Sequence, residues 1–326
     1  VPLLKKEERL SNFNEVELTL TEDQAVYESK RCLNCGICSE CLECEKVCAP
    51  LAISHNMQDE HIKLKAGAII IAPGVKLFDA DYKKEYGYGR YDNVVTSIQF
   101  ERILSSSGPT AGQILRPSDS KPPKKIAFIQ CVGSRDPSCG NEYCSAVCCM
   151  YSIKEAIIAK EHDPDIEPTI FYIDIRSFGK DFERYYENAK KDYGVKFIRC
   201  MISKIYERPK SKNLTLNYID ELGRVQEAEF ELVVLAVGMT FTDELKPLAE
   251  KLEIATNEYG FCRTQRSSPG LTSRPGVFIA GTFAEPKDIP EAVTDGSSGA
   301  ALVLTLLKDA RGSLVAKKEY LRERNV

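Results

Sequence analysis

Two groups of cysteines carry the clearest chemistry in this sequence of 326 residues, which contains 13 cysteines. The first group consists of Cys131, Cys144, Cys148 and Cys149. An apolar segment, Lys125–Gln130, leads into it, and the residues from about Ser145 to Glu161 read as a helix without Pro or Gly. Residues four apart share one face of a helix, so the strand end and the helix start would bring these four thiols together.

Four thiols at one strand–helix junction favour an iron–sulfur cluster over the other uses of cysteine. Unpaired cysteines are often buried, but so dense a group is unusual for a structural role. Disulfides are disfavoured because no secretory signal is visible and adjacent cysteines pair badly. Zinc stays open, although its sites usually have two separated pairs of ligands. Cys139, in the intervening loop, is a spare thiol in this interpretation.

The second group lies in the segment CLNCGICSECLECEKVC near the N-terminus. Its members are Cys32, Cys35, Cys38, Cys41, Cys44 and Cys48. The last four have the spacing C-x2-C-x2-C-x3-C, which is close to that of bacterial ferredoxins. We expect an iron–sulfur cluster here, while the four ligands and the presence of a second cluster stay open. A zinc ribbon is the weaker alternative, because it needs two knuckles at a longer separation.

An alternation of strands and helices surrounds the first cysteine group and indicates an α/β fold. Strands are predicted at 125–130, 168–176, 195–199 and 230–237, and helices at 145–161 and 181–191. After the first strand the sequence is CVGSR, where a dinucleotide-binding unit would carry G-x-G-x-x-G. The unit is therefore predicted to be a degenerate nucleotide-type domain. Asp174, near the usual ribose-binding position, is expected to be vestigial or structural.

Composition and charge limit the possible partners. The net charge of −4 gives no reason to expect nucleic acid or an anionic membrane surface. The longest apolar runs, 66–73 and 232–237, are too short to cross a bilayer. Clustered cysteines indicate a reducing, cytoplasmic compartment. The first residue is Val rather than Met, which leaves three alternatives open: a fragment, a processed product and one piece of a split subunit.

Several motifs closely resemble those of the A-type subunits of heterodisulfide reductases, which are the flavin-containing iron–sulfur subunits of methanogens and of related bacterial complexes. They are CVGSRD, YCSAVCCMYSIKEA, YIDIRSFGKDFERYY, GYGRYDNVVTSIQFERIL, GPTAGQILRPSD and GVFIAGTFAEPKDIPEAV. The resemblance covers residues 65 to 307. It implies a thioredoxin-reductase-like two-domain body with FAD. It also implies a [4Fe-4S] cluster held by Cys131, Cys144, Cys148 and Cys149, without Cys139.

The resemblance also implies where the flavin would bind. A strand at 276–281 and the helix that follows it would lie against the ribityl–phosphate and pyrimidine end of the flavin. There, backbone N–H groups and the helix dipole favour the cofactor's oxygens. The expected binding residues are Pro73, Gly74, Gly281, Thr282, Lys287, Asp288, Ile289 and Ala292. An ordinary buried strand–helix pair is the alternative for this segment.

Lys154 is the expected catalytic residue. It is four residues after Met150 and therefore lies on the Met150 face of the predicted helix. The resemblance would place it near the reactive edge of the isoalloxazine, where a cation favours the reduced anionic flavin. A solvated lysine on a charged helix, together with Glu155 and Lys160, is an equal alternative.

These expectations divide the chain into three parts. Residues 1–60 form an N-terminal helical iron–sulfur segment, and residues 122–238 form the degenerate nucleotide-type domain with a cluster. Residues 61–121 and 239–326 form a flavin-binding-type domain. The glycine-rich βαβ unit that normally binds the FAD adenosine half is not among these residues. Another chain or a further segment supplies that unit, or flavin binding is lost.

The sequence thus predicts an oxidoreductase, an electron-transferring flavo-iron–sulfur subunit that could bifurcate electron pairs at its flavin. Its expected partners are other subunits of a heterodisulfide-reductase-like complex, namely iron–sulfur subunits and a hydrogenase or dehydrogenase electron donor, in an oligomer. A flavin-free iron–sulfur scaffold is one alternative. An FAD-dependent NAD(P)H oxidoreductase is another, and the missing glycine loop argues against it.

Overall fold

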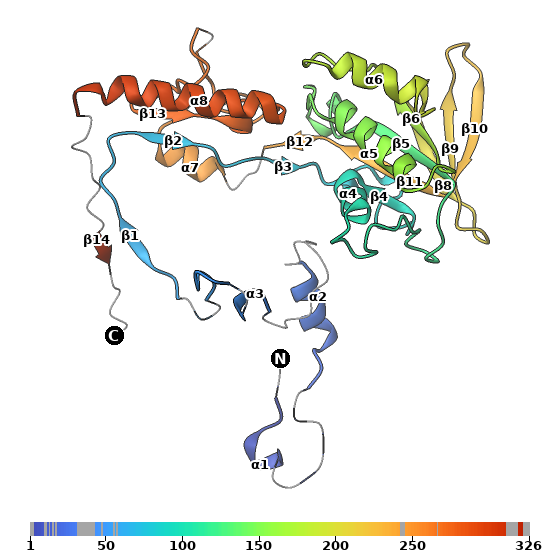
Figure 1. The fold of residues 1–326 in the computed structure, drawn as a ribbon, viewed down its shortest axis with the longest axis horizontal. Helices are drawn as coiled ribbons and strands as arrows, with labels where there is room; N and C mark the ends of the chain where they lie inside the picture. The colour runs from blue at the N-terminus through green and yellow to red at the C-terminus, as the bar shows by residue number, and fades with distance from the viewer. Residues whose placement is uncertain are drawn as a thin grey trace.

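The structure, a computed structural model, describes residues 3–9, 12, 14, 16, 18–30, 43–46, 48–54, 56, 58–241, 245–265, 267–310 and 319–321. A layered α/β part and a smaller part around a long helix make up most of the fold, and a narrow two-stranded link joins them (Figure 1).

A parallel five-stranded sheet forms the centre of the layered part. Its strands are, in spatial order, β4 (Val94–Thr96), β11 (Leu232–Val237), β5 (Lys125–Val132), β6 (Glu167–Tyr172) and β7 (Lys196–Arg199). Every residue of β11 is buried, as expected for a central strand that is covered on both faces.

Helices cover one face of this sheet and a second, antiparallel sheet covers the other (Figure 1). The helices are α4 (Ser97–Leu104), α5 (Cys148–His162) and α6 (Phe182–Lys191), and the second sheet contains β8 (Ile202–Glu207), β9 (Leu214–Ile219) and β10 (Val225–Phe230). Along β5, Ile126 and Phe128 pack towards the helices, while Ala127 and Ile129 pack towards β9. This alternation is the ordinary two-residue period of a strand.

The smaller part is built on the parallel pair β2 (Ile69–Ile71) and β13 (Val277–Ile279). Helix α8 (Ile289–Leu306) packs on this pair, and α7 (Lys246–Lys251) lies nearby (Figure 1). Asp288 caps α8 with a capping box to Glu291. The antiparallel strands β3 (Lys76–Leu77) and β12 (Met239–Thr240) form the link.

Short elements precede and follow these two parts. They are α1 (Lys6–Arg9), α2 (Glu22–Lys30), α3 (Glu43–Lys46), and the antiparallel pair β1 (His61–Lys63) and β14 (Glu319–Leu321). The capping box predicted at Thr21 and Gln24 is confirmed, with reciprocal hydrogen bonds of 3.0 and 3.3 Å. Among the described residues, no helix is both long and apolar enough to span a bilayer.

The strands predicted around the first cysteine group are confirmed, with different ends. The expected strand 168–176 ends at Tyr172, and the helix expected from Ser145 begins at Cys148. The helix starts late because Ala146 is left-handed, with φ 61°, which a right-handed helix cannot contain. Strand β4 and helix α4 belong to the predicted 61–121 segment but pack with β11 and α5. The domain boundaries stay a prediction.

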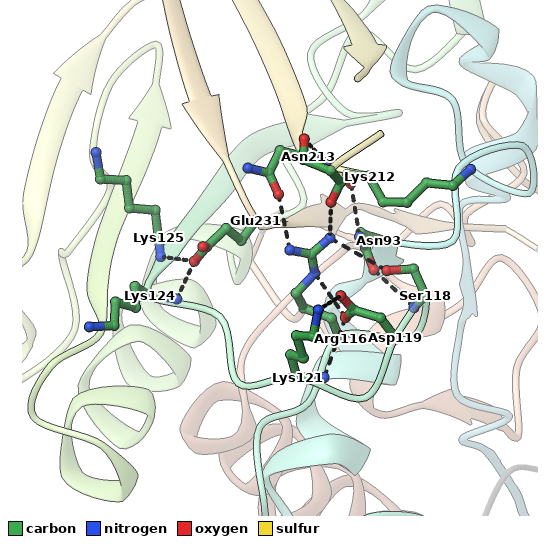
Figure 2. A network of polar contacts seen from close by, with 11 residues as sticks. Asn93, Arg116, Ser118, Asp119, Lys121, Lys124, Lys125, Lys212, Asn213 and Glu231 are labelled. Carbon is green, nitrogen blue, oxygen red and sulfur yellow. Dashed lines mark hydrogen bonds and ion pairs between the residues drawn. The ribbon is translucent and has the colours of Figure 1, made fainter. Parts of the chain in front are cut away.

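A buried arginine fixes the crossover segment 105–123 to the second sheet (Figure 2). The Arg116 side chain is 6% exposed. Its guanidinium donates to Asn213 Oδ1 at 3.0 Å and to the Ser211 carbonyl at 2.7 Å, and its Nε lies 3.3 Å from an Asp119 carboxylate oxygen. Only the planar fork of arginine reaches several acceptors in such fixed directions.

We therefore predict that Arg116→Lys lowers the free energy of unfolding by about 1–3 kcal/mol, because buried acceptors lose their donors. Urea denaturation of both proteins measures this difference. Lys121→Ala is the control, because Lys121 pairs with the same Asp119 from a side chain that is 74% exposed. An equal effect of the two substitutions would contradict the structural role of Arg116.

Candidate functional site

The loop between β5 and α5 returns the chain to the end of β11 through an unusual backbone. Cys131, Arg135 and Ala146 are left-handed, with φ of 60°, 56° and 61°. Each such non-glycine residue costs on the order of 1 kcal/mol or more, so neighbouring contacts must hold it. Ser145 supplies these contacts: its Oγ lies 3.0 Å from Ser134 Oγ and accepts from the Met239 N–H at 2.8 Å.

The four predicted thiols lie close enough for their charges to act on one another. Burial raises the pKa of Cys131 to about 12, with further contributions from Cys149 and Cys144. Burial and the same neighbours, together with Cys131, raise the pKa of Cys148. Burial also raises the pKa of Cys149, to which Cys144 contributes. These thiols would therefore stay protonated unless a cation compensates the thiolate charges.

Backbone amides face two of these sulfurs. The Ala146 N–H donates to Cys144 Sγ at 3.3 Å, and the Arg176 backbone N–H acts on Cys149 so as to favour its thiolate. Cys139, predicted to be a spare thiol, instead bonds to Ser138 and Asp136 in its own turn.

The described residues include no group of three or more His, Cys, Asp or Glu side chains arranged around a single metal ion. A cubane makes a different demand, since each of its four thiolates binds a separate iron atom. The donor set, its burial and its amide donors all fit such a cluster.

The second cysteine group is described only in small part. Cys32, Cys35, Cys38 and Cys41 lie outside the described residues, as does the side chain of Cys44. Cys48 is half-buried, and its Sγ accepts from the Ala52 N–H at 3.3 Å. The N-terminal cluster therefore stays a prediction.

A large cavity of about 760 Å³ lies between the two parts of the fold, with walls from α4, α5, α6 and α8. Six residues predicted from sequence line it: Lys154, Thr282, Lys287, Asp288, Ile289 and Ala292. Its volume is in the range of pockets that bind small molecules and cofactors. The expected arrangement of Lys154 and Met150 on one face agrees with the structure, because both residues line the cavity.

Two lysines of the cavity wall are held by carboxylates. Lys154 Nζ lies 2.8 Å from Glu101 Oε2 on α4, so it is neither free nor fully solvated. Lys287 is 7% exposed and forms an ion pair with Asp295, whose carboxylate also accepts from the Gly281 N–H at 3.1 Å. The Thr282 hydroxyl is buried without a hydrogen-bond partner, which leaves it available to a ligand.

Three of the predicted binding residues do not line this cavity. Pro73 and Gly74 are exposed at the end of β2, where Gly74 has φ 79° and open space around it. Gly281 has φ 74° and lies behind Thr282, bonded to Asp295.

The start of α5 is shared between the thiol group and the cavity. Cys148 and Cys149 belong to the thiol group, while Val147, Met150 and Tyr151 line the cavity. Less than one helical turn of 5.4 Å pitch thus separates the two features along the chain.

A smaller cavity of about 300 Å³ lies at the carboxyl ends of β5, β6 and β7, where a nucleotide would bind in a doubly wound fold. Cys131 and Arg135 line it, and Arg135 forms an ion pair with Asp174. Asp174 is thus engaged in a structural contact.

Two contributions to the large cavity have no counterpart in the sequence analysis. Lys180, Phe182 and Tyr185 come from the start of α6, and Glu101 reaches Lys154 across 53 residues of chain. The cavity-facing positions on α6 carry no motif. The amphipathic pattern of that helix was the only available signal, and it indicates packing rather than a ligand.

Comparison with known proteins supports the expected relationship. Residues 165–296 match the pyridine nucleotide-disulphide oxidoreductase family. A solved thioredoxin reductase from T. acidophilum overlaps with 74% of this chain and 66% of its own, at 18% identity and a TM-score of 0.48. The family match and the parallel sheet with its covering helices agree with the predicted fold class.

More similar relatives are named as reductase subunits. The iron–sulfur A-type subunit of CoB–CoM heterodisulfide reductase from Methanocaldococcus jannaschii is 42% identical over 89% of this chain and 46% of its own. The second such protein of Methanopyrus kandleri is 47% identical over 78% and 40%. The A-type subunit of the H(2):CoB-CoM heterodisulfide,ferredoxin reductase from Methanothermobacter marburgensis is 42% identical over 81% and 40%.

The chain spans less than half the length of these relatives. Within that span the expected resemblance is confirmed, and the chain is related over most of its residues to the family of heterodisulfide reductase A-type subunits.

Proposed function

We propose that this chain is an electron-transferring flavo-iron–sulfur subunit of a heterodisulfide-reductase-like complex. The observation that carries the proposal is the start of α5, which contributes Cys148 and Cys149 to a four-thiol group and Val147, Met150 and Tyr151 to the large cavity. A cluster and a cofactor held on one helical turn would lie close enough to exchange electrons directly.

The cluster would be a [4Fe-4S] centre held by Cys131, Cys144, Cys148 and Cys149. Buried thiols with raised pKa values suit metal binding, because iron supplies the positive charge that stabilises the thiolates. The amide donors at Cys144 and Cys149 would further tune the potential.

The large cavity would hold the flavin of FAD, which supplies both one- and two-electron chemistry when bound. Thr282 offers a buried hydroxyl without a partner, and the Lys287–Asp295 pair fixes the turn that carries it. Lys154 would place its ammonium at the flavin, where Glu101 holds it by an ion pair. The adenosine half would need a further segment or another chain.

Electrons would come from a protein partner. The smaller cavity at the nucleotide position is about 300 Å³ and is closed by the Arg135–Asp174 pair, which leaves little room for a dinucleotide. The names of the relatives support partner subunits of a heterodisulfide reductase complex. The complex would be cytoplasmic, and the N-terminal cysteines would bind a second cluster. Bifurcation of electron pairs at the flavin is part of the proposal.

The cluster ligands can be tested by Cys131→Ser. We expect about four fewer iron atoms per chain and loss of the corresponding visible absorption, because a cubane needs four thiolates. Iron and sulfide analysis of the anaerobically purified protein measures this. Cys139→Ser is the matched control, since Cys139 lies in the same loop but bonds to Ser138 and Asp136. Equal iron in C131S and the wild type would refute this ligand set.

The flavin site can be tested by filling the cavity. Ala292→Phe should lower the bound flavin at least about tenfold, because about 1–3 kcal/mol of overlap corresponds to that change. Val293→Phe is the control, because it adds the same ring at a neighbouring position that is 64% exposed. Flavin is released from the anaerobic complex and quantified. Iron without flavin in the wild type would instead favour the scaffold alternative.

The donor can be tested with reduced nicotinamide cofactors. We expect NADH and NADPH to leave the anaerobic protein oxidised, while dithionite reduces it, because no glycine loop or open pocket receives a dinucleotide among the described residues. Absorption spectra recorded during titration follow the reduction. Rapid reduction by either nucleotide would favour the NAD(P)H oxidoreductase alternative.

A further inference from the structure

A row of polar side chains is buried between α4 and α5. We call it the α4–α5 seam, and it consists of Ser97, Glu101, Tyr151, Ser152 and Glu155. Ser97, Ser152 and Glu155 are only 1%, 0% and 2% exposed. Ser97 Oγ, Ser152 Oγ and Glu155 Oε2 are buried without a hydrogen-bond partner. Three such oxygens at one helix interface are unusual, because buried polar groups are almost always paired.

The spacing of these residues makes the seam continuous. Ser97 and Glu101 are four apart on α4, Tyr151 and Glu155 are four apart on α5, and the two helices pack together. Ser97 and Tyr151 line the large cavity. At the other end, Glu101 is 44% exposed and pairs with Lys154. The seam therefore runs from the cavity wall to the protein surface.

Water would satisfy the unpaired oxygens of the seam. Buried waters typically make about three hydrogen bonds to otherwise unpaired polar groups. The Tyr151 hydroxyl adds a further polar group beside them, although it donates to the Val237 carbonyl at 2.8 Å.

Glu155 is the titratable group at the centre of the seam. Burial and the Glu101 carboxylate on α4 raise its pKa well above the ordinary value, and Lys154 on α5 acts in the opposite direction. The sheet side of α5 presents apolar residues, Ile126, Phe128 and Ile170, and α6 presents the neutral Tyr185. The Glu155 carboxyl group is therefore held with its proton inside the fold.

We propose that the α4–α5 seam is a proton path between solvent and the large cavity, with Glu155 as the internal proton donor. This inference rests on the proposed function, because uptake of an electron pair from the cluster in the cavity requires a proton. The proton leaves the Glu155 carboxyl group and reaches the cavity through the end at Ser97 and Tyr151. The Glu155 carboxylate then regains a proton from solvent through the end at Glu101.

Glu155→Gln tests the path, because the amide keeps the shape of the side chain and cannot supply the proton. In the anaerobic complex with its flavin, reduction at pH 7 should become about 100-fold slower, in line with the loss of a positioned proton donor. Its solvent deuterium isotope effect should also change. Glu161→Gln is the matched control on the exposed end of the same helix, and it should behave as the wild type.

A second measurement does not depend on the flavin. Because the folded pKa of Glu155 is raised, the wild-type stability that it contributes is present at low pH and is lost as pH rises above the unfolded value of about 4.3. E155Q should lack this part of the pH dependence, and the infrared band of a protonated carboxylic acid at pH 7 should disappear. Ser97→Ala, at the cavity end, should also slow reduction and keeps the test available if E155Q does not fold.

The outcomes separate the two proposals. Absence of flavin with the infrared band present would refute the proposed cofactor and, with it, the path to that cofactor. Flavin present, with unchanged reduction rate and pH dependence in E155Q or S97A, would overturn the proton path alone. Loss of the band together with slower reduction would support it.

Discussion

The backbone between β5 and α5 is the constraint on which the candidate site depends. Three non-glycine residues in residues 131–147 are left-handed, and each disfavours the folded state. Ser145 offsets this strain by bonding to Ser134 and to the Met239 N–H. The fit is tight, because a Cβ on Gly238 would lie 2.7 Å from Ser145 Oγ. A glycine at the end of β11 thus allows the thiol loop to close.

Local patterns predicted the elements around this loop, and the physical reason is clear for each. The run of apolar residues in β11, the two-residue alternation in β5 and the capping box at Asp288 all depend on neighbours in sequence. The convergence of four thiols followed from their spacing and from one strand–helix junction. The second group of cysteines was equally plain in sequence, and most of it lies outside the described residues.

Long-range contacts were beyond the reach of such patterns. Glu101 pairs with Lys154, and α6 contributes to the cavity, only because the helices pack on one sheet face. Strand β4 joins the sheet beside β11, although its sequence lies before the crossover segment. The exposed position of Pro73 and Gly74 outside the cavity likewise depends on how the two parts of the fold meet. No periodicity in a single segment encodes these choices.

The link between the two parts has a mechanical consequence. Strands β3 and β12 pair over only two residues each, so they resist bending far less than the five-stranded sheet. The large cavity has α5 on one wall and α8 on the other, and its width therefore follows the angle at the link. A molecule that fills the cavity becomes part of the interface between the two parts. Loading and unloading it would then stiffen and relax the whole chain, much as a hinge pin sets the play between two plates.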